Sequence, residues 1–349
     1  MSDLTTENIQ VSVIVACRNE IGHIYKFLDS LSRQELCGIS AEVLIADGMS
    51  DDGTRQIVEQ HQTRNPSVQI IDNSGKIVST GLNAAIRQAR GEIIVRMDAH
   101  TEYAPDYISR CVEVLNETNA QNVGGAARTR ADGYCAQAIA FAYGISFACG
   151  GARFHDARYE GYVDTVPYGC WRKSTFERLG GFDERLTRNQ DDELNLRIIS
   201  AGGKIWQSPM IQSWYRPRKN LTALFQQYFQ YGFWKIAVIR KHRRPASWRH
   251  LIPGACILIG VLMLGGAVGA DLFGSELWTI AFLGSLAALL GIYSTLSIVA
   301  AIQVARHSGW RFLPFLPVVF ATYHISYGLG FLLGIAYRPA DWNLSLIHI

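Results

Sequence analysis

The first hundred residues alternate between short, strongly apolar runs and longer amphipathic segments. Four runs rich in β-branched residues have the length of buried strands: 11–16, 41–46, 68–71 and 92–95. Three segments between them carry apolar residues at helical spacing: 24–32, 54–62 and 81–89. Alternation of this kind predicts an α/β domain with a mostly parallel sheet and helices on both faces. The Gly-rich stretch 144–169 is expected to form loops.

The last third of the chain is far more apolar. Segments 251–270, 277–302 and 312–337 are almost free of charge and long enough to cross a bilayer. We expect three membrane helices, and the alternative is a buried helical hairpin of a soluble protein. Basic residues precede the first helix and separate the second from the third, whereas Asp271 and Glu276 lie between the first two. The positive-inside rule then places the N-terminal domain in the cytosol, in a multi-pass inner-membrane protein whose chain ends outside.

These patterns divide the chain into four parts. Residues 1–235 form the expected cytosolic α/β domain, 236–250 a basic juxtamembrane or interfacial segment, and 251–343 the transmembrane region. Residues 344–349 read like translated adapter DNA, so we expect a non-native tail. No signal peptide is evident at the N-terminus, so the membrane helices are expected to direct the chain to the membrane.

Charge and cysteine content exclude several classes of function. A formal net charge of +3 is too small to indicate nucleic acid as a partner. The basic residues concentrate beside the apolar segments, where membrane lipids with anionic headgroups would attract them. Seven cysteines without a Cys-x-x-Cys pair predict reduced thiols rather than a zinc site or a disulfide framework.

Acidic residues follow the ends of three predicted strands. Glu20 comes after the first, Asp47 ends the second, and Asp98 and His100 follow the fourth. Because the carboxyl ends of parallel strands share one edge, these groups should gather there, and the acids need a cation or a hydrogen-bonding ligand. Asp98 and His100 can hold a divalent ion, which indicates a diphosphate substrate. The alternative for His100 is a hydrogen-bonded strand-end histidine without a ligand.

Five motifs together carry a resemblance to a known family. They occupy residues 11–20, 47–54, 98–100, 180–184 and 189–194. In order and spacing they resemble the inverting family 2 glycosyltransferases of GT-A fold and, among them, the glucosyltransferases of succinoglycan biosynthesis. The resemblance covers roughly the first two-thirds of the chain, and the set is more specific than any single motif.

The resemblance implies roles for individual residues. Asp47 would bind the uracil of a UDP-sugar, Glu20 would line the nucleotide pocket, and Asp98 would lie close to the ribose and the metal. His100 would ligate the metal where the family more often has a second aspartate. An imidazole ligand shifts the expected preference from Mg²⁺ toward Mn²⁺, since nitrogen ligands suit the softer ion.

Transfer also needs a base for the attacking sugar hydroxyl. Asp191 opens an acidic helix start and is the candidate, because the helix dipole would keep its carboxylate ionised. Asp192 is its rival and a possible acceptor-binding residue, and ordinary acidic capping is the alternative for both. Trp234 lies at the position of the tryptophan in the Gln-x-x-Arg-Trp motif of processive members, but Phe233 replaces the arginine. Trp234 is therefore a candidate for stacking on the acceptor or for anchoring at the membrane surface.

We therefore expect a membrane-bound, metal-dependent, inverting hexosyltransferase of bacterial exopolysaccharide or other surface-glycan synthesis. It would move a hexose, first of all glucose, from a UDP-sugar to a polyprenyl-diphosphate-linked saccharide. A processive polysaccharide synthase is one alternative, and it would require a homo-oligomer. Synthesis of a polyprenyl-phosphate sugar is another. From a different class comes a non-catalytic nucleotide-sugar-binding subunit of a membrane complex.

Overall fold

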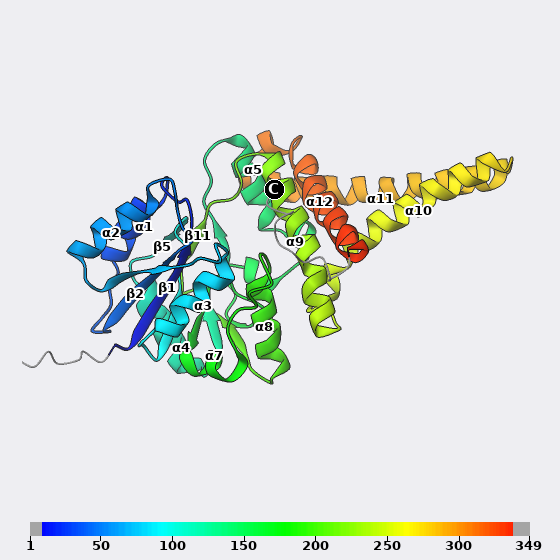
Figure 1. Ribbon diagram of the computed structural model, residues 1–349. Helices are drawn as coiled ribbons and strands as arrows, with labels where there is room; N and C mark the ends of the chain where they lie inside the picture. The colour runs from blue at the N-terminus through cyan, green and yellow to red at the C-terminus, as the bar shows by residue number, and fades with distance from the viewer. Residues whose placement is uncertain (1–8, 338–349) are drawn as a thin grey trace, which may run out of the picture. The chain divides into compact units, whose positions relative to one another are not determined.

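The computed structural model describes residues 9–337 and divides into two compact units (Figure 1). The first, which we call the sheet unit, takes in residues up to Thr129 and Arg153–Arg216. The second, the helical unit, takes in Arg130–Ala152 and the chain from Pro217. The expected tail at 344–349 and the end of the transmembrane region at 343 lie outside the described residues.

The sheet unit is built on an eight-stranded sheet of order β3-β2-β1-β4-β9-β6-β10-β8. Its parallel half confirms the four predicted strands: β1 Val11–Cys17, β2 Ala41–Asp47, β3 Val68–Asp72 and β4 Ile93–Arg96. The other half consists of β6 Asn122–Gly124, β8 Gly161–Tyr162, β9 Cys170–Arg172 and β10 Ile205–Gln207. β9 runs antiparallel between β4 and β6, so the sheet is mixed at this point.

Helices cover both faces of the sheet, as the strand pattern predicts. On one face Val13 and Val15 of β1 join an apolar cluster with helices α1 Ile24–Ser32, α2 Thr54–Arg64 and α4 Tyr107–Thr118. On the other face Ile14 joins a cluster with α3 Val78–Gln88, α7 Lys173–Leu179 and α8 Gln190–Ser200. Successive β1 side chains therefore enter opposite layers, and the strand is apolar except for Ser12 because both of its faces are buried.

A small second sheet continues from the end of β4. Its central strand is β11 Ser213–Tyr215, which pairs antiparallel with β5 Thr101–Tyr103 and parallel with β7 Arg128–Thr129. β5 begins directly after His100, so this sheet supports the turn that carries Asp98 and His100.

The helical unit contains the three predicted apolar helices: α10 Ile252–Leu272, α11 Glu276–Ser308 and α12 Leu316–Ala336. All three are long and apolar enough to cross a membrane. The second segment of the unit begins at Pro217, whereas the expected boundary lies after residue 235, because α9 Leu221–His242 packs along α12. The unit also takes in α5 Tyr134–Tyr143 and α6 Ser146–Cys149, the second within a stretch expected to form loops. Both join an apolar cluster with α11 and α12 that no local pattern predicts.

Candidate functional site

The loops after β1 and β2 are fastened to each other at the carboxyl edge of the sheet. Asn19 donates from Nδ2 to Asp51 Oδ1 (2.9 Å), and the Asp51 amide donates back to Asn19 Oδ1 (3.1 Å). The Glu20 amide donates to Thr54 Oγ1 at 2.8 Å. Asn19 has a φ of 55°, a left-handed conformation that asparagine tolerates better than most residues. These bonds fix the backbone on both sides of Glu20.

Asp47 lies at the end of β2 with its side chain fully buried. Its Oδ1 accepts from the Ser50 hydroxyl at 2.5 Å, and its Oδ2 accepts from the Ser50 amide at 3.1 Å. Arg55 Nη1 is 3.5 Å from the same Oδ2. In this arrangement the carboxylate holds the β2 loop, and contact with a nucleobase would require the Ser50 bonds to open or to be shared.

An ion cluster at the end of β4 joins two of the predicted site residues. Arg96 donates from Nε and Nη2 to the two Asp98 oxygens, at 3.1 and 3.2 Å. Its Nη1 lies 3.1 Å from Asp191 Oδ2 as an ion pair, without hydrogen-bond geometry. The Arg96 side chain is only 5% exposed, whereas Asp98 is 16% and Asp191 34% exposed. A buried cation thus lies beneath two carboxylates that reach solvent.

Asp191 occupies the first turn of α8, after Asn189 in a left-handed conformation. Desolvation raises the pKa of the Asp191 carboxyl, and the charges of Asp192 and Asp98 act in the same direction. Arg96 opposes them, but the net direction is upward. Desolvation thus opposes the ionisation that the helix dipole is expected to favour, and the effect of the dipole on Asp191 stays a prediction. A carboxylate with a raised pKa is the stronger proton acceptor, which suits a general base.

His100 and Glu20 bring the ends of β4 and β1 together. His100 Nδ1 is 3.2 Å from Glu20 Oε1, and their side chains are 44% and 21% exposed. The ring of His23 lies edge-on to that of His100, with centroids 6.5 Å apart. Glu20 can therefore orient the imidazole, as carboxylates do for metal-binding histidines.

The number of ligands available decides how Asp98 and His100 could hold a divalent ion. Within residues 9–337 no group of three or more His, Cys, Asp or Glu side chains gathers as a ligand set. Asp98 keeps lone pairs beside those that accept from Arg96, and His100 adds an imidazole. Such a pair does not suit a closed protein cage. It does suit an ion that takes its other ligands from a diphosphate and water.

The sequence did not indicate the aromatic support of this turn. The Asp98 amide donates to the Tyr103 hydroxyl at 2.6 Å, and the ring of Tyr103 packs against that of Tyr168. The hydroxyls of Tyr168 and Thr101 are 2.7 Å apart. Arg96 was missed as well, although a charged residue at the last position of a buried strand was a usable signal.

Two further predicted site residues, Asp192 and Trp234, make no ion pair with Arg96 of the kind that Asp98 and Asp191 make. Asp192 follows Asp191 in the first turn of α8, is partly exposed, and acts on Asp191 through its charge. Trp234 belongs to α9 in the helical unit, is 3% exposed, and packs edge-on against Phe233 at 5.8 Å. Because its ring is buried, it offers no face for a sugar, and we leave it out of the acceptor site.

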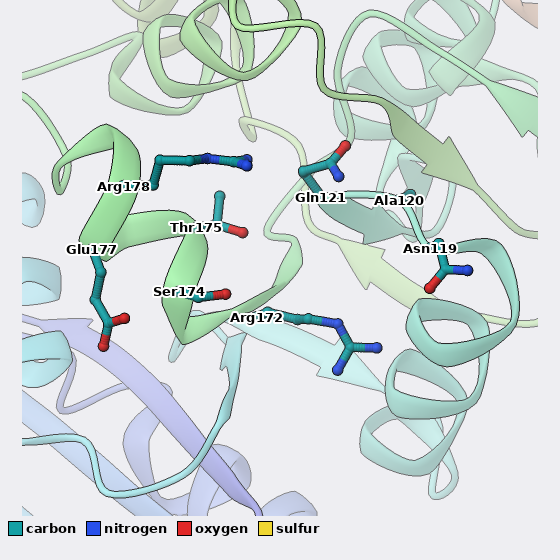
Figure 2. A pocket seen from close by; sticks show the side chains of 8 residues that line it. All are labelled: Asn119, Ala120, Gln121, Arg172, Ser174, Thr175, Glu177 and Arg178. Atoms are coloured by element: carbon teal, nitrogen blue, oxygen red, sulfur yellow. The ribbon is translucent and has the colours of Figure 1, made fainter.

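A cavity of about 490 Å³ opens in the sheet unit away from these residues (Figure 2). Arg172 and Arg178 line it together with Gln121. Arg172 pairs with Ile93 at the start of β4, whereas Asp98 follows the end of that strand. The cavity therefore lies at the opposite edge of the sheet from Asp98. We place the candidate site at the carboxylate cluster because of its chemistry, despite the size of the cavity.

The mixed sheet and the acidic cluster at its edge fit a transferase of GT-A fold, and comparisons with known proteins identify the family. Residues 12–136 match the family described as glycosyl transferase family 2. The succinoglycan biosynthesis protein ExoA of Rhizobium meliloti is 34% identical over 255 residues, which cover 72% of this chain and 77% of that protein. The chain belongs to glycosyltransferase family 2.

Two further similarities agree with this assignment. The dolichyl N-acetyl-alpha-D-glucosaminyl phosphate 3-beta-D-2,3-diacetamido-2,3-dideoxy-beta-D-glucuronosyltransferase of Methanococcus voltae is 26% identical over 73% of this chain and 82% of its own length. The structure of the mannosyltransferase PcManGT from Pyrobaculum calidifontis in complex with GDP-Man and Mn²⁺ superposes with a TM-score of 0.58 at 20% identity. It covers 94% of this chain and 88% of that chain. This likeness confirms the predicted GT-A fold.

Proposed function

We propose that this glycosyltransferase is membrane-bound and inverting, and that it moves a hexose, first of all glucose, from a UDP-sugar to a polyprenyl-diphosphate-linked saccharide. The observation that carries the proposal is the Asp98–Arg96–Asp191 cluster. It holds one carboxylate suited to a cation and another suited to proton transfer on either side of one buried guanidinium. A transferase with a diphosphate leaving group and an alcohol nucleophile needs both.

On the donor side, Glu20 and the β1 loop would line the nucleotide pocket, and Asp47 would reach the uracil. Asp98 and His100 would hold Mn²⁺ or Mg²⁺, which supplies Lewis-acid stabilisation of the diphosphate as it leaves. The buried Arg96 guanidinium hydrogen-bonds Asp98 and forms an ion pair with Asp191, so it would hold the two carboxylates in place relative to each other.

On the acceptor side, Asp191 would take the proton of the attacking sugar hydroxyl. The new bond forms between that oxygen and the anomeric carbon, and the bond from this carbon to the diphosphate breaks on the opposite face, which inverts the configuration. The raised pKa of Asp191 favours this step, and Asp192 contributes through its charge and as a possible contact to the acceptor.

The apolar helices support a lipid-linked acceptor, because an enzyme held at the membrane meets its substrate in two dimensions rather than three. The Methanococcus voltae relative carries a dolichyl phosphate substrate in its name, and ExoA is a succinoglycan biosynthesis protein. We accordingly propose an inner-membrane protein of exopolysaccharide or related glycan synthesis with the sheet unit in the cytosol, either alone or as a homo-oligomer.

Membranes that contain the protein, incubated with labelled UDP-glucose, Mn²⁺ and lipid-linked saccharides, test this function. The addition of one sugar per acceptor is the expected result. A long polymer would favour a processive synthase, and labelled polyprenyl phosphate formed without a saccharide acceptor would favour synthesis of a lipid-phosphate sugar. UDP binding without turnover across a panel of nucleotide sugars would indicate a non-catalytic subunit.

A further inference from the structure

Helices α9 and α12 pack against each other along their length and in the same direction. Tyr228 contacts Tyr323 near the start, with ring centroids 4.4 Å apart. Near the end, Arg240 donates to the carbonyl oxygens of Ile335 and Tyr337 at 2.8 and 2.6 Å. Because the two helices run parallel and in contact, both must make the same angle with the membrane plane.

Small residues make this contact close. A side chain at Gly232 of α9 would collide with the carbonyl of Tyr327, and one at Gly330 of α12 with that of Phe229. Gly334 meets the Phe233 carbonyl in the same way. A backbone-to-backbone pair of this kind moves as one body, so α12 cannot enter the bilayer without α9.

The composition of α9 argues against a bilayer crossing. It has 22 residues, but among the described helices only α10, α11 and α12 combine the length and apolar composition of a span. Three glutamines lie in its first half, and Lys235, Arg240 and Lys241 in its second half. Charged side chains are costly at membrane depth.

The exposed residues of the apolar helices differ in their distribution. In α10 exposed apolar side chains occur at neighbouring positions, including Leu258, Ile259, Val261 and Leu262, so every face of the helix is apolar. In α12 four of them form one stripe, Val318, Ile325, Leu329 and Leu333, and only Ile335 near the end of the described helix lies off it. Only 11% and 17% of the candidate spans containing α10 and α11 are buried, against 44% in α12. Lipid can thus reach most of α10 outside its contacts with α11 and α12, whereas it can reach α12 mainly from one side.

We propose that only the α10–α11 hairpin crosses the bilayer, whereas α12 lies with α9 in the membrane surface and turns its apolar stripe toward the lipid. Figure 1 shows α10 and α11 extending together away from the rest of the helical unit. Residue 337 then lies on the same side of the membrane as α9. This topology replaces the expected exit of the chain on the far side.

The partner surface that fits is an anionic lipid layer. Arg243, Arg244 and Arg249 lie between α9 and α10, Arg306 lies in the last turn of α11, and Arg311 lies between α11 and α12. The tip of the hairpin instead carries Asp271 and Glu276. Basic residues beside an apolar stripe are typical of segments that bind negatively charged headgroups.

Reporter fusions at the C-terminus of the full chain separate the two topologies. Green fluorescent protein should fluoresce there and alkaline phosphatase should stay inactive, with both signals normalised to the amount of protein. Active phosphatase with dark green fluorescent protein would overturn the proposal. Phe273→Cys at the hairpin tip and Trp310→Cys between α11 and α12 serve as controls, because both topologies place the first outside and the second inside. An impermeant maleimide should label only the first in intact cells, above the background of the native cysteines.

A depth measurement tests the orientation of α12 directly. Spin labels at Val318, Ile325 and Leu333, in cysteine-free protein reconstituted in vesicles with anionic lipid, should report one common depth from oxygen and nickel accessibility. If α12 crossed the bilayer, the label at Ile325 would lie about 10 Å deeper than that at Val318. Active phosphatase at the C-terminus, or this depth gradient along α12, would refute the surface location of α12. Neither result depends on which sugar the enzyme transfers.

Discussion

Replacement of Asp191 by asparagine tests the proposed base with the smallest change in shape. The carboxylate loses its charge and its basicity, while the new side chain can still lie beside Arg96 Nη1, which is 3.1 Å from Asp191 Oδ2. Arg96 keeps its two hydrogen bonds to Asp98, so its buried charge remains compensated. We therefore expect the variant to fold and to bind UDP with nearly unchanged affinity.

The expected loss lies in the rate of transfer. A positioned general base contributes about 10²–10⁴-fold. At 1.36 kcal/mol per factor of ten, this corresponds to roughly 3–5 kcal/mol of transition-state stabilisation. The contact of Asp191 with the end of β4 is its ion pair with Arg96, which Asp98 continues to hold, so little of this loss should come from displacement of the donor site.

Initial rates of sugar transfer at saturating donor, together with UDP affinity from titration calorimetry in detergent, separate the two effects. Asp192→Asn is the matched control, since it removes a neighbouring charge from the same helix turn and should lower the rate far less. If Asp191→Asn weakened UDP binding as strongly as it lowered the rate, or if Asp192→Asn showed the larger loss in rate, the assignment of the base would be refuted.

Three further predictions follow from contacts in the sheet unit. Arg96→Gln removes the charge that lowers the pKa of Asp191, so the acidic limb of the transfer rate against pH should move to higher pH, and an unmoved limb would argue against the coupling. His100→Ala should raise the Mn²⁺ concentration for half-maximal UDP binding about tenfold or more. We also expect the wild-type protein to be more active with Mn²⁺ than with Mg²⁺. Unchanged metal dependence of the variant, or wild-type activity with Mg²⁺ alone, would remove His100 from the site. Glu42→Gln breaks a buried network in which Glu42 accepts from Ser12 Oγ (2.7 Å) and from the Arg90 amide (2.7 Å), at a cost of about 1–3 kcal/mol. Burial raises the pKa of Glu42, but the hydrogen bonds from Arg90 and Ser12 together outweigh burial and lower it. This contribution is therefore present above the ordinary pKa of a glutamate and disappears as the pH falls through the lowered value. The apparent unfolding temperature in detergent should drop for Glu42→Gln and hardly change for the exposed control Glu113→Gln, and equal shifts would contradict the account.

The parallel half of the sheet was predictable because its signals are local. Each of β1 to β4 is a short β-branched run, and both faces of each strand are buried, so periodicity alone located them to within one residue at each end. The helical unit was less predictable. α5 lies far from α12 in the sequence, and its place beside that helix depends on long-range packing in the apolar cluster that includes Ile139 and Phe320.

The site divides along the same line. The approach of Glu20 to His100 follows from strand ends that share one edge, so it was predictable from topology. The pairing of Asp191 with Arg96 was not, because it depends on how α8 docks on the sheet. The burial of Trp234 was equally hidden, since the spacing of a motif does not show which side of a helix is packed.

The most direct test of the central claim is a structure of the protein with UDP and Mn²⁺, in which anomalous scattering at the manganese edge locates the ion. The account predicts one ion bound by an Asp98 oxygen and by the diphosphate, at the sheet edge that carries Asp191. An ion and nucleotide bound at the opposite edge, in the cavity lined by Arg172 and Arg178, would contradict it.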